Sequence, residues 1–131
     1  MNTMRKVAAV AVGSATLLAL GVTQAQAEGS RNSYMSSWGR GHESNRWYDN
    51  NHDSLVTGVQ FHNCVTDSSF NSATIGLYQD ISAAPDRGYG NRTNYCNYSS
   101  WTRPGKGSFY FKLNDFSGGS VLSVNPVYIN W

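Results

Sequence analysis

The chain has 131 residues, of which 14% are charged and 13% aromatic, and its formal net charge at pH 7 is +2. A chain of this length accommodates one domain of ordinary size. The excess positive charge equals the contribution of Arg5 and Lys6 near the N-terminus, so residues 28–131 are neutral overall. This neutrality argues against nucleic acid or an anionic membrane surface as the partner.

Residues 1–27 have the pattern of a secretory signal peptide. Arg5 and Lys6 form a positive n-region, residues 7–22 form an apolar run, and Ala25-Gln26-Ala27 is a small-residue cleavage site. The apolar run is short for a membrane span, and no cluster of charged residues follows it. We therefore expect cleavage after Ala27, no membrane span, and a mature extracellular protein of residues 28–131.

The next segment, residues 28–53, has no apolar periodicity and is predicted to be a flexible N-terminal arm. It is rich in Gly, Asn, Asp, Ser and Arg, yet it also contains Trp38, Trp47 and Tyr48. Arginine and large aromatic residues dominate the binding energy of protein interfaces, so we expect this arm to dock on a partner. The alternative, which applies most to Trp47, is that the arm folds back over an edge of the domain's own sheet.

The rest of the chain, residues 54–131, has the pattern of an all-β domain. Apolar and polar residues alternate in about six short stretches, at residues 55–64, 73–81, 95–101, 109–113, 121–124 and 127–131. Residues 85–94 are predicted to be a turn-rich loop, and Pro126 indicates an edge position or a break between two strands. The expected architecture is a small antiparallel β-sandwich or barrel.

Two cysteines, Cys64 and Cys96, lie in the expected β domain. An even number of cysteines in an exported protein predicts a disulfide bond between them. Closing a loop of about 30 residues would stabilise the fold by about 3–4 kcal/mol.

The histidines and acidic residues do not have the spacing of a metal site. His42, His52 and His62 lie ten residues apart, whereas ligand pairs on one element usually lie two to five residues apart. We therefore expect neither a metal nor a cofactor.

Asp49, Asn51 and Asp53 have the spacing with which a calcium-binding loop begins. The positions that need Gly and Glu hold Ser54 and Gln60 instead. We expect these Asp and Asn side chains to form turns rather than to bind calcium.

The sequence offers no catalytic residue that can be assigned. No serine lies in a G-x-S-x-G motif, and the two glutamates, Glu28 and Glu43, both fall in the expected arm. A small ribonuclease-like hydrolase would need a Glu base near a His acid, and His62 is the only histidine in the expected domain. A hydrolase remains the weakest alternative, and we predict a protein that is not an enzyme.

The aromatic residues divide into core and surface candidates. Trp101, Phe109 and Phe111 are expected to pack in the core, because strands favour aromatic residues. Tyr89 lies in the Gly-, Asn- and Arg-containing loop, where burial is difficult. The residues predicted to bind a partner are Arg31, Trp38, Arg40, Arg46, Trp47, Tyr48 and Tyr89.

The stretch Ser44-Asn45-Arg46-Trp47-Tyr48-Asp49-Asn50-Asn51-His52-Asp53, followed by a strand that ends at Cys64, supports a family resemblance. With the signal and the polar arm before it, this order resembles the small adaptor subunit of the umbrella toxins, secreted antibacterial particles of filamentous actinobacteria. The similarity covers most of residues 28–131.

The resemblance implies a scaffold role. Such adaptors link a large toxin subunit with alanine-rich helical repeats to a lectin-like subunit that binds cell surfaces. Their flexible arm inserts into the cleft of the lectin subunit's trypsin-like domain. In this sequence residues 31–46 would be the inserting arm, and residues 47–53 with one face of the β domain would meet the other partner.

The residues of the arm are compatible with such an insertion. Arg40, between Gly39 and Gly41, could lay its backbone in an extended groove and offer its guanidinium group to a carboxylate. The prediction is a secreted, non-enzymatic adaptor with protein partners. The alternative is a free-standing bacteriocin-like toxin, or a protease inhibitor in which the Arg40 loop imitates a substrate.

Overall fold

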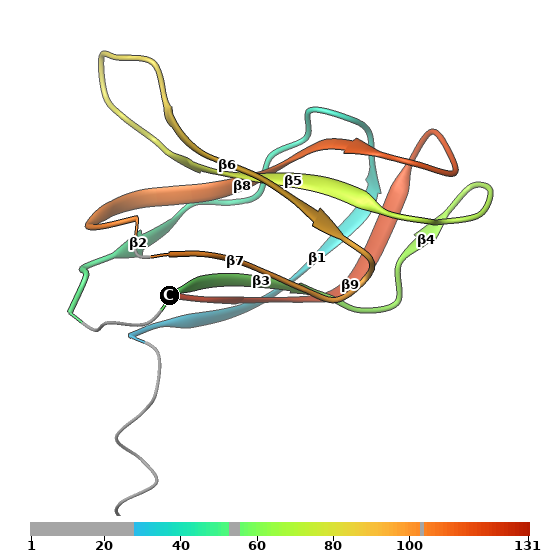
Figure 1. The fold of residues 1–131 in the computed structure, drawn as a ribbon, viewed down its shortest axis with the longest axis horizontal. Helices are drawn as coiled ribbons and strands as arrows, with labels where there is room; N and C mark the ends of the chain where they lie inside the picture. Colours follow the sequence, from blue (N-terminus) through green and yellow to red (C-terminus); the bar gives the residue numbers. More distant parts are fainter. Residues whose placement is uncertain (1–27, 53–55, 103) are drawn as a thin grey trace, which may run out of the picture.

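The computed structural model describes residues 28–52, 56–102 and 104–131, so the predicted signal peptide lies outside the described residues. Within these ranges the chain forms nine strands and no helix, arranged as two antiparallel sheets that pack face to face (Figure 1). The prediction of an all-β antiparallel sandwich is confirmed.

The two sheets are built from strands that lie far apart in the sequence. The first sheet has the order β1 (Ser30–Trp38), β9 (Leu122–Asn130), β3 (Thr57–Phe61) and β7 (Tyr98–Trp101), and β4 (Val65–Thr66) also pairs with β9. The second sheet has the order β2 (Trp47–Asp49), β8 (Gly107–Phe116), β5 (Ala73–Gln79) and β6 (Arg87–Asn94). The chain therefore crosses between the sheets several times, and β8 and β9 each lie inside a sheet.

The core lies between the sheets and is filled by alternate residues of the central strands. Because successive side chains of a strand point to opposite faces, one apolar set from each sheet meets in the middle. The expected core residues Trp101, Phe109 and Phe111 are at most 2% exposed. Other buried members are Val59, Phe61, Ile75, Leu77, Leu113, Leu122, Val124, Val127 and Ile129.

Strand β9 replaces the two strands predicted around Pro126. Its pairing with β1 shifts register between Met35, opposite Val124, and Ser33, opposite Val127. The extra residue forms a bulge that contains the cis Asn125-Pro126 peptide, and both valines stay in the core. The proline therefore lies in an inner strand at a bulge, and not at a sheet edge, since a bulge removes the need for its missing N–H.

The boundary predicted at residues 53 and 54 does not separate an arm from a domain. Within residues 28–52, the described part of the predicted arm, β1 pairs with β9 and β2 pairs with β8, and Met35 and Trp47 are each 2% exposed. Strand β1 shows no apolar period because it is an edge strand, whose inward positions include Arg31 and Ser33 near the rim. The segment is a structural part of both sheets.

Residues 85–94, predicted to be a loop, contain β6, the edge strand of the second sheet. Most of its residues are exposed, so it lacks the apolar alternation by which a strand is recognised. The polar composition reflects its edge position.

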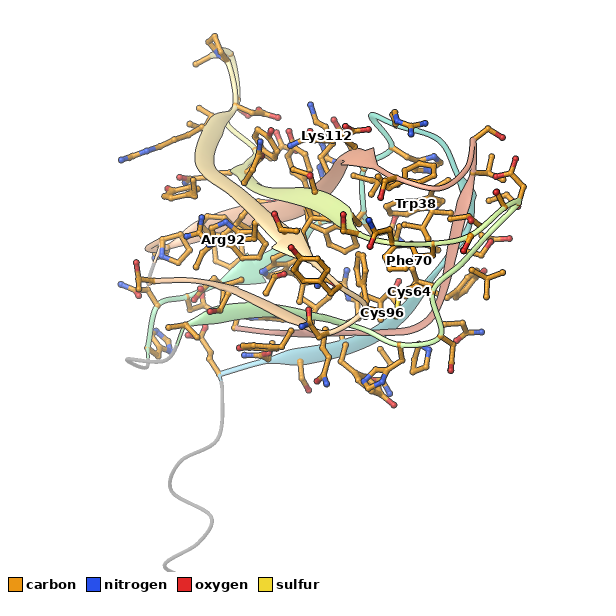
Figure 2. All side chains as sticks on the ribbon, turned by 45° about the vertical axis from the view of Figure 1, so that its right-hand side comes forward. Trp38, Cys64, Phe70, Arg92, Cys96 and Lys112 are labelled. Carbon is orange, nitrogen blue, oxygen red and sulfur yellow. A yellow bond between two sulfur atoms is a disulfide. The ribbon has the colours of Figure 1, made fainter. Side chains whose placement is uncertain are left out.

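The predicted disulfide bond between Cys64 and Cys96 is present, with the two Cα atoms 5.8 Å apart (Figure 2). Cys64 follows β3, and Cys96 lies in the turn between β6 and β7. Because β3 and β7 are neighbours, the bond ties the turns at one end of the first sheet.

Candidate functional site

Arg40, predicted to reach into a partner, is held by the domain itself. Its Nε lies 2.6 Å from Asp115 Oδ1, its Nη2 donates to the Phe116 carbonyl at 2.5 Å, and its guanidinium carbon lies 4.2 Å from the centre of the Phe116 ring. The hydrogen bond from Arg40 lowers the pKa of Asp115. The Arg40 guanidinium group is therefore paired within the protein, whereas a substrate-like arginine would present a free one.

Arg46 is also engaged, on the outer face of the second sheet. It pairs with Glu43 at 3.0 Å and with Asp80 at 2.9 Å, and lies 3.8 Å above the centre of the Tyr110 ring. Burial opposes the charge, but the hydrogen bonds to Asp80 and Glu43 outweigh it and raise the pKa of Arg46. The Tyr110 hydroxyl donates to Asp86, and burial together with this bond raises the pKa of Tyr110.

Three of the predicted aromatic anchors pack against the domain itself. Trp38 is half-buried and stacks on His42 at 4.3 Å, and the buried Trp47 stacks on Trp131 at 5.9 Å. The Tyr89 hydroxyl lies 3.0 Å from Gln79 Oε1, and the ring packs near the core. For Trp47 the structure thus has the folded-back arrangement that the sequence left as an alternative.

The segment between β1 and β2 runs along β8 and is held there by its main chain. Gly41 N donates to the Leu113 carbonyl at 2.6 Å, Leu113 N donates to the His42 carbonyl at 2.9 Å, and Ser44 N donates to the Phe111 carbonyl at 2.9 Å. Residues 39–46 therefore extend the edge of the second sheet beyond β2. These backbone bonds make the segment a fixed surface.

Four of the seven predicted partner-binding residues lie along this edge, and three of them, Arg31, Arg46 and Tyr48, lie toward one end. Arg31 Nη1, from β1, donates to the Arg46 carbonyl at 2.8 Å, and Tyr48, two residues further on, is 52% exposed. We define Arg31, residues 39–46 and Tyr48 as the crossover edge. Trp38 and Arg40 lie at its far end, whereas Tyr89 lies on β6.

The start of β1 is fixed to the residues after β2. The Glu28 carboxylate accepts hydrogen bonds from Asn50 N at 2.6 Å and His52 N at 2.7 Å, and the bond from His52 is the main reason that its pKa is lowered. Asp49 Oδ1 accepts a hydrogen bond from Asn51 N at 2.7 Å, the turn expected for this stretch. Asp53 lies outside the described residues.

Sequence reasoning missed a second surface, on the outer face of the first sheet. Tyr34 of β1, Tyr98 of β7 and Tyr128 of β9 are 65%, 46% and 39% exposed. The register places Asn32, Tyr128, Gln60 and Tyr98 opposite one another in one row across four strands. We define the tyrosine face as the outward side chains Asn32, Tyr34, Gln60, His62, Tyr98, Tyr128 and Asn130.

The tyrosine face has support from within the sheet. A Cβ atom at Gly58 would collide with the ring and hydroxyl of Tyr98, so this ring lies across the strand at Gly58. The Tyr128 ring meets the His62 ring edge-on, with centres 5.2 Å apart. The sequence did contain a signal for this face. Tyr128 alternates with the buried Val127 and Ile129, so its side chain must point away from the core.

The described residues form no pocket. Residues 28–52, 56–102 and 104–131 also contain no group of three or more His, Cys, Asp and Glu side chains that could hold a metal ion. In this part of the chain there is no helix of the length and apolarity that crossing a bilayer requires.

Comparison with protein-family models, with curated protein sequences and with solved structures finds no match to the chain. Function is therefore inferred from the two surfaces, the crossover edge and the tyrosine face.

Proposed function

We propose that the protein is a secreted, non-enzymatic adaptor that docks a protein partner along its crossover edge. The observation that carries the proposal is the meeting of Arg31, Arg46 and Tyr48 on one edge of the sandwich. Tyrosine and arginine are the residue types that most often anchor protein interfaces. The signal-like N-terminus and the disulfide bond support secretion.

The rigidity of the edge favours binding. Its backbone is hydrogen-bonded to β8, and the Arg46 side chain is fixed between Glu43 and Asp80. A partner therefore has few rotamers and little backbone to order, which reduces the entropic cost of association. Tyr48 presents an exposed ring that a partner can bury.

The resemblance to the umbrella-toxin adaptors suggests which partners the protein holds together. They would be a lectin-like subunit with a trypsin-like domain and a toxin subunit with helical repeats. Because Met35 is buried, detaching residues 30–38 as an inserting arm would remove a core side chain, at a cost of about 2–5 kcal/mol. We therefore propose docking of the folded edge rather than insertion of a free arm.

Affinity capture from the culture supernatant of the producing organism tests the proposal. The tagged protein is compared with the Arg31→Ala/Tyr48→Ala variant, and captured proteins are identified by mass spectrometry. We expect the wild-type protein to retain a specific partner and the double variant to lose at least about 90% of it, as for two hot-spot residues.

Tyr95→Ala is the matched control. Tyr95 is 63% exposed, similar to Tyr48, but lies in the turn between β6 and β7. It should retain the partner. Equal capture by all three proteins would show that the crossover edge is not the docking surface.

A further inference from the structure

The side chains of the tyrosine face belong neither to the hydrophobic core nor to the crossover edge. Strands β3, β4, β7 and β9 contain no charged residue, and the one charged residue of β1, Arg31, donates to the Arg46 carbonyl on the crossover edge. Around Tyr34, Tyr98 and Tyr128 the outward positions hold amides, hydroxyl groups and one imidazole. The face is thus aromatic, polar and neutral.

We propose that the tyrosine face binds a neutral, β-linked polysaccharide with equatorial ring substituents. This surface is separate from the crossover edge, so the inference goes beyond the adaptor function and does not depend on it. The following arguments concern the orientation of the rings, their spacing, and the absence of charge.

The rings are oriented for stacking. The Tyr98 ring lies across Gly58 and is 46% exposed, so one side is supported by the strand while solvent reaches the ring. The Tyr128 ring is supported by the edge-on contact with His62. The axial C–H bonds of a sugar with equatorial substituents carry partial positive charge, which the negative face of an aromatic ring attracts.

The spacing of the rings fits a chain of sugars rather than a single one. Tyr128 and Tyr98 both oppose Gln60, from β9 and β7 on either side of β3, so their Cα atoms lie about two strand spacings, or ~10 Å, apart. Tyr34 continues the face onto β1, two residues beyond Asn32. A ligand that contacts all three tyrosines must extend over several sugar rings.

The neutrality of the face selects the class of ligand. Nucleic acids and anionic lipid headgroups need lysine and arginine, which the tyrosine face lacks. Protein interfaces are enriched in arginine and have a polar rim, which describes the crossover edge better. The amides of Asn32, Gln60 and Asn130 both donate and accept hydrogen bonds, as sugar hydroxyl groups do.

Titration of the mature protein with chitohexaose and with cellohexaose, followed by NMR or calorimetry, tests the proposal. Sedimentation with insoluble chitin and cellulose gives a second readout. We expect at least one of the two glycans to bind, and Tyr98→Ala and Tyr128→Ala each to weaken that binding by about tenfold, as expected for hot-spot residues.

Three further variants sharpen the test. Gly58→Ala keeps every tyrosine but displaces the Tyr98 ring, so it should also weaken binding. Tyr48→Ala and Tyr95→Ala remove rings outside the tyrosine face that are more exposed than those of Tyr98 and Tyr128, and both variants should bind as the wild-type protein does. Circular dichroism shows whether each variant is folded before its affinity is compared.

The proposal is overturned if neither glycan binds at millimolar concentration, or if Tyr98→Ala and Tyr128→Ala bind unchanged. Capture of a protein that is lost in these two variants, without glycan binding, would identify the face as a protein interface instead. The adaptor proposal fails separately, through the Arg31→Ala/Tyr48→Ala capture experiment.

Discussion

Tyr110 and Tyr128 occupy matching positions, since each lies on the outer face of an inner strand, β8 in the second sheet and β9 in the first. Tyr110 is nevertheless 2% exposed and Tyr128 39% exposed. The difference comes from side chains outside the sheet, because Arg46 covers the Tyr110 ring and Asp86 accepts a hydrogen bond from the Tyr110 hydroxyl. Charged groups from connecting segments therefore decide which outer face keeps its tyrosines available.

The same contrast extends over both faces. On the second sheet the Tyr78 ring stacks on the Tyr110 ring, with centres 5.6 Å apart. The Nζ atom of Lys112, a residue labelled in Figure 2, lies 4.9 Å from the centre of the Tyr78 ring. These cation–π contacts and ion pairs are satisfied within the protein. The outward residues that make up the tyrosine face include no lysine or arginine, and Arg92 lies over the inward-facing Trp101 ring instead, so the tyrosine rings stay open to a ligand.

Replacement of the two matched tyrosines should separate the faces most clearly. Tyr110→Ala leaves a cavity beneath Arg46 and removes one of the hydrogen bonds to Asp86, so we expect a loss of about 3–5 kcal/mol in the free energy of unfolding. Tyr128→Ala removes a ring that is already partly in solvent, and should cost about 1 kcal/mol or less. Urea denaturation measures both, and equal losses would remove the distinction between the faces.

The comparison also requires that β1 belongs to the first sheet, because β1 supplies Tyr34. Met35→Ala should then destabilise the protein by about 2–5 kcal/mol, as for other buried side chains. Ser36→Ala, at the exposed neighbouring position, should change stability by no more than about 0.5 kcal/mol. If residues 28–53 were a detached arm, the two substitutions would have the same small effect on urea denaturation.

Much of the sandwich followed from the sequence because its inner strands alternate. Phe109, Phe111 and Leu113 gave β8 a clear period of two, and the two cysteines of an exported chain gave the disulfide bond. Strands β1, β2 and β6 did not show this period, because each lies at a sheet edge or is only three residues long. Edge strands expose most of their side chains, so they resemble loops in sequence.

The candidate surfaces were harder to predict, for a topological reason. Tyr34, Tyr98 and Tyr128 are separated by dozens of residues and meet through the order β1-β9-β3-β7, which no local pattern encodes. Arg40 shows the opposite error, because its flanking glycines suggested a mobile residue that is free to contact a partner. Its bonds to Asp115 and the Phe116 carbonyl depend on pairing with a strand 75 residues away.

Acid should weaken the contacts on the outer face of the second sheet, where Asp86 lies, more than those of the tyrosine face on the first sheet. The hydrogen bond from Tyr110 is the largest cause that lowers the pKa of Asp86 below its usual 3.8. A carboxylate with a lowered pKa in the folded state stabilises the protein above its unfolded pKa, and this stabilisation is lost as the pH falls through the folded value. The melting temperature should therefore drop below about pH 4.

Asp86→Asn should melt at a lower temperature near pH 6 and show a smaller fall from pH 6 to pH 2. Some fall remains, because Asp115 keeps a lowered pKa and that of Asp67 is lowered to about 2, chiefly by the Ser120 hydroxyl. Tyr128→Phe, on the neutral face, should keep the full wild-type fall. If the melting temperatures of the wild type and Asp86→Asn fell by the same amount from pH 6 to pH 2, the result would contradict the role given to Asp86.

The smallest effect should follow from uncovering one ring of the second face. Lys112→Ala removes the cation above Tyr78 and should cost about 0.5–1 kcal/mol in urea at low ionic strength. Lys106→Ala, at an exposed position before β8, should cost nothing measurable, and equal losses would mean that the contact with Tyr78 contributes nothing.

The Lys112→Ala variant also tests whether one uncovered tyrosine ring is enough to bind a glycan. It removes the cation from the Tyr78 ring, yet that ring still stacks on Tyr110, which Arg46 covers, so a charged group remains beside it. We expect no gain of glycan binding in the titration with chitohexaose and cellohexaose. A gain would show that one exposed ring suffices, and that the neutral row across β1, β9, β3 and β7 is not required.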